Sequence, residues 1–83
     1  MQATASMYVY SIKSINHPKF YIGITADPKQ RLADHNNGKS PHTSKYKPWK
    51  MAVCVWFADE QKAKDFEKYL KSGSGRAFSA RHF

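Results

Sequence analysis

The stretches MYVYSIK at residues 7–13 and KFYIGIT at residues 19–25 decide the fold of this 83-residue chain. Both are rich in aromatic and β-branched residues, and SINHP at residues 14–18 has the composition of a turn. We therefore predict two antiparallel strands joined as a β-hairpin. Because side chains alternate along a strand, Phe20 and Ile22 share one face and Tyr21 points to the other, which we expect to be polar.

A first helix is predicted after the hairpin. Asp27 is followed by a proline and, three positions on, by Gln30, which is the pattern of an N-cap with a capping-box partner. Gly38 is a natural C-terminal glycine. Arg31 and His35 are four residues apart, so we expect them on one polar face of this helix.

Residues 51–57, MAVCVWF, form an apolar run without alternation. Their β-branched and aromatic content favours a strand, and the lack of alternation predicts one that is covered on both faces. The lone cysteine, Cys54, lies inside this run and is expected to pack as a small hydrophobic residue. With a single cysteine, the chain can form no internal disulfide and no cysteine-rich zinc site.

A second helix is predicted from an N-cap at Asp59 to a point before SGSG at residues 72–75, with an apolar stripe at Ala63, Phe66 and Leu70. Residues 76–83 are long enough only for a short last helical segment. The order strand, strand, helix, strand, helix predicts an α/β (α+β) fold, with a small, mainly antiparallel three-stranded sheet flanked by helices. The length predicts one domain over residues 1–83.

The chain is strongly basic, with 14 Lys and Arg against 6 Asp and Glu and a formal charge of +8. Such a charge attracts polyanions, so we expect a nucleic acid as the partner. Residues 39–50 contain no acid, carry two aromatic residues, and resemble a nucleic-acid-contacting loop. The expected contacts are Lys39, Lys45, Lys47 and Lys50, joined by Arg76. The alternative is a solvated loop whose lysines confer only solubility.

Composition also limits where the chain is expected to act. No stretch approaches the roughly 18 apolar residues of a membrane-spanning helix, and residues 1–6 lack the charged and apolar regions of a signal peptide. We expect a reducing, cytoplasmic setting, no membrane association, no small-molecule cofactor and a monomer.

Several short motifs now come in a fixed order. Tyr8-Val9-Tyr10 precedes Tyr21-Ile22-Gly23, which is followed by Arg31-Leu32, by His35-Asn36 and by the segment EKYLKSGSGR at residues 67–76. Over residues 7–78 this arrangement resembles the GIY-YIG nuclease superfamily. It is most similar to the small single-domain members, of the kind found at the N-terminus of the excision-repair incision subunit.

The resemblance implies a metal-dependent endonuclease that hydrolyses DNA phosphodiester bonds, directed by DNA structure more than by sequence. Glu67 would bind one Mg²⁺ or Mn²⁺ ion, and Tyr10 or Tyr21 would deprotonate or orient the attacking water, with Tyr21 preferred. Arg31 would clamp the phosphate. His35 would bind the phosphate, protonate the leaving group or orient Arg31.

Alternative interpretations stay open at this point. Glu67 has the spacing of an ordinary helical pair with Lys71, the tyrosines that of cross-strand packing, and His35 that of a surface histidine. The chain also departs from the family at Tyr8, where a glycine is usual, and at Ile24 and Ser79, where many members carry lysine and asparagine. The competing function is therefore a non-catalytic nucleic-acid-binding module that keeps the nuclease fold.

Overall fold

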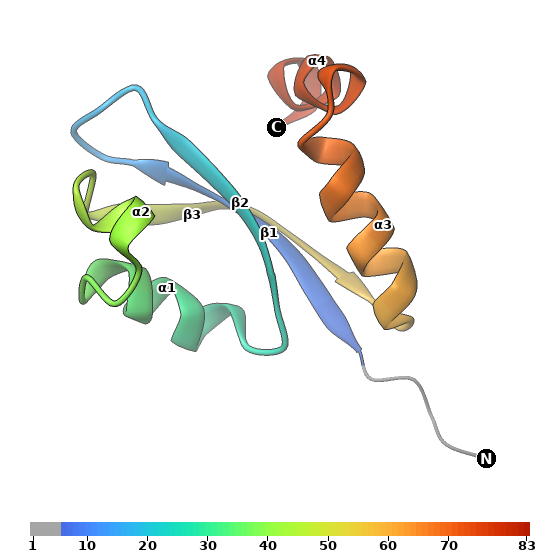
Figure 1. Cartoon of the computed structure of the whole chain (residues 1–83), viewed down its shortest axis with the longest axis horizontal. Helices are drawn as coiled ribbons and strands as arrows, with labels where there is room; N and C mark the ends of the chain where they lie inside the picture. Colours follow the sequence, from blue (N-terminus) through green and yellow to red (C-terminus); the bar gives the residue numbers. More distant parts are fainter. Residues whose placement is uncertain (1–5) are drawn as a thin grey trace.

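Three strands and four helices make up the computed structural model, which describes residues 6–83 (Figure 1). The elements follow one another as β1 (Met7–Ser14), β2 (Phe20–Thr25), α1 (Pro28–Asn36), α2 (Pro41–Ser44), β3 (Trp49–Phe57), α3 (Glu60–Leu70) and α4 (Gly73–His82). The predicted α+β fold, its hairpin and its element order are confirmed. The signal-peptide expectation concerns residues that, apart from Ser6, lie outside the described part. Within residues 6–83, no helix has the length and apolarity needed to span a membrane.

The sheet is antiparallel throughout and has the strand order β2-β1-β3. The central strand, β1, places Tyr10 between Gly23 of β2 and Cys54 of β3. One face of the sheet, called here the α1 face, carries Tyr10 and Tyr21, and the opposite face, the α3 face, carries Val9. Figure 1 shows α1 and α2 on one side of the sheet and α3 and α4 on the other. The register of β1 with β3 shifts between Ser11 and Ile12.

Each face of the sheet has its own apolar cluster. On the α3 face, Val9 and Ile22 pack against the helical stripe that includes Ala63 and Leu70, as predicted. On the α1 face, buried Tyr10, Ile12 and Trp49 are joined by partly buried Tyr21, Leu32, Tyr46 and Met51. The prediction of a polar face around Tyr21 was therefore wrong, because α1 and the segment before β3 cover that face with a second core.

The expectation that residues 51–57 form a doubly covered strand was also wrong. β3 is an edge strand, and its residues alternate between partly buried and exposed along the run. Cys54 and Trp56 lie on the α1 face where no helix covers them, so Cys54 is exposed and does not pack in the core. Apolar composition alone does not report burial at the edge of a small sheet.

The predicted start and end of α1 are confirmed. The Asp27 carboxylate accepts a hydrogen bond from the Gln30 backbone N–H at 3.1 Å, and Gly38 has a φ of 76°. The Gln30 side chain does not complete a capping box, because its Nε2 donates to Asp34 at 3.0 Å while the Asp27 N–H donates to Thr25. The single-turn helix α2 after Gly38 was not predicted.

The last helix is longer than its sequence suggested. α4 begins at Gly73 and runs for ten residues, and the Ser72 hydroxyl accepts a hydrogen bond from the Gly75 N–H at 3.2 Å. A Cβ placed on Gly75 would collide with the Tyr69 carbonyl oxygen and lie 2.5 Å from the Leu70 Cα. Gly75, in a stretch expected only to follow the end of the preceding helix, therefore lets the first turn of α4 approach the end of α3.

Two glycines two positions apart provide a matched test of this contact. We expect Gly75→Ala to lower the free energy of unfolding by about 1–3 kcal/mol, because the new methyl group would meet rigid backbone. Gly73→Ala should leave it unchanged or raise it by up to about 1 kcal/mol, since a Cβ at Gly73 meets nothing within 4 Å. Urea unfolding followed by circular dichroism measures both, and equal effects would contradict the close-approach explanation.

Candidate active site

A hydrogen-bonded chain of three buried side chains occupies the α1 face. The Tyr10 hydroxyl lies 2.8 Å from His35 Nε2, and His35 Nδ1 lies 2.7 Å from the Thr43 hydroxyl. Tyr10, His35 and Thr43 are each no more than 1% exposed. The prediction of a surface histidine is thereby excluded: His35 is the buried residue of α1.

The direction of the protons follows from the far end of this chain. The Thr43 hydroxyl donates to the Ser40 carbonyl at 3.4 Å, so its oxygen is left to accept from His35 Nδ1–H. A neutral imidazole protonated on Nδ1 carries a lone pair on Nε2. Tyr10 therefore donates its hydroxyl proton to His35, and the Tyr10 oxygen keeps its own lone pairs for another donor.

Burial sets the protonation states of this pair. It lowers the pKa of His35, with the Arg31 guanidinium acting in the same direction, so the imidazole is neutral near pH 7. Burial also raises the pKa of Tyr10, and nearby Arg31 opposes that shift only in part. In the resting protein Tyr10 is thus a phenol that donates to a neutral imidazole.

Four further charged or aromatic groups lie around Tyr10. The Tyr21 ring is 6.3 Å from that of Tyr10 and 5.1 Å from that of His35. Lys71 Nζ lies 5.9 Å above the Tyr21 ring and 3.3 Å from the Glu67 carboxylate. The contact with Tyr10 raises the pKa of Arg31, and Glu67 helps to raise that of Tyr10. The five residues expected to carry the chemistry, Tyr10, Tyr21, Arg31, His35 and Glu67, are therefore neighbours.

The glycine of the second motif makes room for Tyr10. A Cβ on Gly23 would lie 2.5 Å from the Tyr10 hydroxyl oxygen and 2.7 Å from Cζ, well inside normal contact distance. Because Tyr10 is buried, its ring cannot move aside. The glycine is thus required by the position of the tyrosine on the neighbouring strand.

Glu67 is the carboxylate of this site that could hold a metal. Within residues 6–83, no group of three or more His, Cys, Asp or Glu side chains is clustered as a metal site. A lone carboxylate suits Mg²⁺ or Mn²⁺, which retain several waters and take further oxygens from a substrate phosphate. The pairing of Glu67 with Lys71, the alternative expected from spacing, is also present at 3.3 Å.

The residues expected to contact nucleic acid are spread over three elements. Lys39, Lys45 and Lys47 surround α2 and are exposed, and Lys39 pairs with Asp34 at 3.5 Å. Lys50 lies in β3 and Arg76 in α4, both exposed. They do not form one loop surface, because the chain enters the sheet at Trp49.

Comparison with known proteins places the chain in a family. Residues 6–79 match the model of the GIY-YIG catalytic domain. The chain belongs to the GIY-YIG family. The motif that supplies Tyr10 and the motif that supplies Tyr21 and Gly23 are thus the two after which the family is called.

Relatives of two kinds share this GIY-YIG domain. Structure-specific endonuclease subunit SLX1 of Debaryomyces hansenii is 39% identical over 71 residues, or 76% of this chain and 20% of that protein. SLX1 of Candida dubliniensis is 40% identical over 89% of this chain and 27% of that protein. A UPF0213 protein of Streptococcus pneumoniae is 36% identical over 86% of this chain and 70% of that protein. The chain thus spans about a fifth to a quarter of the SLX1 proteins.

Sequence reasoning missed Thr43 and the role of Gly23. Thr43 lies within residues 39–50, where the lysines are the conspicuous feature, and no local pattern links His35 to a threonine eight positions later. The closeness of Gly23 and Tyr10 follows from strand register, which pairs these two residues directly.

The buried histidine makes stability depend on pH. Its pKa is lowered in the folded state, so the unfolded chain binds the proton more tightly below the ordinary imidazole pKa of about 6.5. As pH falls through 6.5, the wild type should lose stability at up to about 1.4 kcal/mol per pH unit until the folded-state pKa is reached. His35→Gln should lack this loss. Urea unfolding between pH 5 and 7.5 compares the two, and parallel curves would refute the assignment.

Proposed function

We propose that this chain is a divalent-metal-dependent endonuclease that hydrolyses phosphodiester bonds in DNA, acting as one GIY-YIG domain. The observation that carries the proposal is the Tyr10, His35 and Thr43 chain, which holds a tyrosine oxygen beside a neutral imidazole. Arg31 and Glu67 supply the two charges that phosphodiester hydrolysis needs next to such a base.

The hydrogen bonds that link Tyr10, His35 and Thr43 suggest how a tyrosine could act as a base near neutral pH. A free phenolate base would require the Tyr10 pKa to fall by about three units, yet burial raises it. We therefore assign the base to Tyr10 and not to Tyr21, which was preferred from the sequence. In a relay, Tyr10 takes a proton from the attacking water while its own proton passes to His35 Nε2. The positive charge then forms on His35, whose Nδ1–H remains bonded to Thr43.

The charged residues would act on the phosphate. Arg31 lies beside Tyr10 and would hold a phosphate oxygen and offset the negative charge that develops on it. Glu67 would bind the Mg²⁺ or Mn²⁺, and its present partner Lys71 would then be released toward the substrate. The metal, when bound, stabilises the scissile phosphate and the leaving oxygen.

Preference for DNA structure follows from size and from the relatives. A domain this small reaches few base edges, so backbone and shape would dominate its recognition. The two SLX1 relatives are named as structure-specific endonuclease subunits. We extend that preference to this chain, and we predict branched or flapped DNA as the better substrate.

Cleavage assays with matched variants test the proposed reaction. Tyr10→Phe and His35→Ala should each lower the rate of cleavage of flapped DNA with Mg²⁺ or Mn²⁺ by about 100-fold or more, because each breaks the relay. Glu67→Gln should remove metal-dependent cleavage. Glu60→Gln is its control, since Glu60 pairs with Lys64 at 3.0 Å on the same helix, just as Glu67 pairs with Lys71.

The alternative function gives a different result in the same assay. A non-catalytic binding module would bind these DNAs without cutting any of them, with or without metal. Equal cleavage by wild type and Glu67→Gln would likewise reject the proposed metal ligand.

Salt dependence tests the lysines before and at the start of β3. If they contact phosphates, changing Lys45, Lys47 and Lys50 to Ser should make the slope of log Kobs against log salt shallower by up to about 2.7. Changing Lys62, Lys64 and Lys68 of α3, which are also exposed, removes the same charge. Equal effects of the two triple variants would show diffuse attraction and would remove the segment from the interface.

A further inference from the structure

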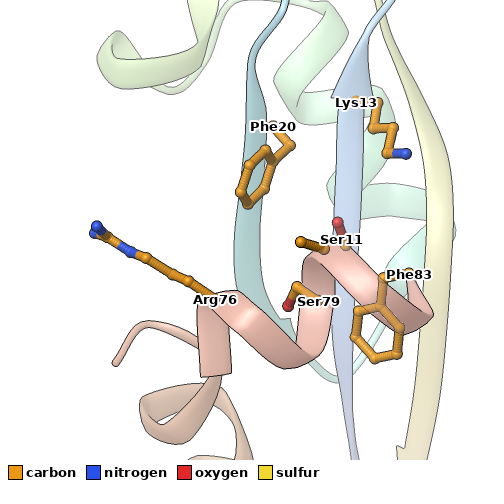
Figure 2. Close-up of a pocket in the computed structure, with 7 residues that line it drawn as sticks. Ser11, Lys13, Phe20, Arg76, Ser79 and Phe83 are labelled. Carbon is orange, nitrogen blue, oxygen red and sulfur yellow. The ribbon is translucent and has the colours of Figure 1, made fainter. Parts of the chain in front are cut away.

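A cavity lies on the α3 face, on the side of the sheet opposite Tyr10. It has a volume of about 390 Å³, within the range of small-molecule and cofactor sites. Figure 2 shows side chains from β1, β2, α4 and the residue after α4 around it, namely Ser11, Lys13, Phe20, Arg76, Ser79 and Phe83. The proposed reaction uses none of these as a catalytic residue.

The cavity contains an unsatisfied buried hydroxyl. Ser79 is 9% exposed, and its Oγ is the one buried side-chain polar atom of residues 6–83 that has no hydrogen-bond partner. A buried hydroxyl without a partner destabilises a fold, and alanine would remove that cost. The hydroxyl therefore has a donor and acceptor free for a molecule that enters the cavity.

The rim of the cavity carries cations without counterions. Lys13 lies directly opposite Lys50 in the pairing of β1 with β3, and like charges in that position repel. Neither these lysines nor Arg76 forms an ion pair in the described residues, whereas Lys39, Lys64 and Lys71 each do. The Arg76 side chain extends outward beyond β2 (Figure 2). An anion at this rim would relieve the repulsion.

This cavity adjoins another one that reaches the candidate active site. A neighbouring cavity of about 470 Å³ is lined by Tyr21 and Lys71 of the candidate active site, and it shares Phe20 and Arg76 with the first. A chain of phosphates that passes Tyr21 at the edge of β2 would therefore come close to Arg76 at the rim of the first cavity.

We propose that the Ser79 cavity binds the base of an unpaired nucleotide that lies next to the cleaved phosphate. Phe20 and Phe83 provide aromatic surface for the base, and Ser79 bonds its polar edge. Lys13 and Arg76 contact the phosphates on either side. The proposal rests on the proposed function for the position of the strand, and it identifies the substrate as DNA with a single-stranded branch.

Binding can be measured apart from cleavage, by fluorescence anisotropy in EDTA. A flapped DNA that carries an abasic nucleotide at successive unpaired positions should bind about 5- to 50-fold more weakly than the intact flap at one of those positions. Phe20→Ala should remove that difference. Phe20 is 56% exposed, so the variant should fold. The control is Ile15→Ala, at a residue 57% exposed in the hairpin loop, which should retain the difference in affinity between intact and abasic DNA.

Ser79→Ala distinguishes a binding role from a structural one. It should lower the discrimination between intact and abasic DNA while leaving the thermal midpoint unchanged or higher, because the lost hydroxyl has no partner in the fold. A lower midpoint with discrimination retained would overturn the assignment.

The outcomes separate this inference from the proposed function. Discrimination that depends on Phe20, without cleavage in metal, would support the cavity and reject the nuclease. Cleavage by a wild type that binds intact and abasic flaps equally would reject the cavity alone. Competition by free deoxyadenosine monophosphate gives a further test. If it displaced the flapped DNA at a concentration as low as that of the DNA itself, the inference would be overturned, since the cavity would then bind free nucleotides.

Discussion

The contact of the Tyr10 ring with Gly23 is the constraint on which the candidate site depends. It requires β1 and β2 in the register that pairs these residues, with no side chain at Gly23. With the ring fixed there, its hydroxyl meets His35 of α1, and His35 in turn meets Thr43 of α2. The Trp49 indole N–H then donates to the Thr43 carbonyl at 2.8 Å, which links α2 to the start of β3. A single aromatic position thus connects the sheet to both small helices.

The cores on the two faces of the sheet differ in polarity. On the α3 face, apolar side chains of β1 and β2 pack against α3, which holds Glu67 and Lys71 beside the edge of β2. On the α1 face, the core itself contains the polar relay, and each of its members is hydrogen-bonded. A satisfied buried network fixes one arrangement of its side chains. The hydrogen-bonded chain of Tyr10, His35 and Thr43 therefore has one fixed arrangement in the folded protein, and the proposed relay would be preorganised.

Much of the fold could be predicted from local patterns, and the failures have physical causes. The hairpin and the caps at Asp27 and Asp59 depend on short-range preferences, which a sequence displays directly. The burial of β3 depends on elements far along the chain, because no helix covers Cys54 and Trp56 at this edge of the sheet. The length of α4 depends on the close approach of Gly75 to the end of α3, which glycine content alone does not reveal. The candidate site residues could be predicted from the order of the motifs. The contact of Thr43 with His35 is visible only in the structure.

The buried polar groups on the α1 face are hydrogen-bonded, whereas the Ser79 hydroxyl on the α3 face is not. This difference indicates where binding a substrate could lower the free energy. The relay on the α1 face already has its hydrogen bonds, so a substrate adds little there in the ground state and changes it only as protons move. At the Ser79 cavity the hydroxyl is unpaired and Lys13 faces Lys50, so a nucleotide would relieve costs that the free protein bears. Under the two proposals, the free energy of binding a nucleotide at the Ser79 cavity, away from Tyr10, would help to position the phosphate beside Arg31. The two proposals thus assign base recognition and the proton relay to opposite faces of one sheet, joined around the edge of β2.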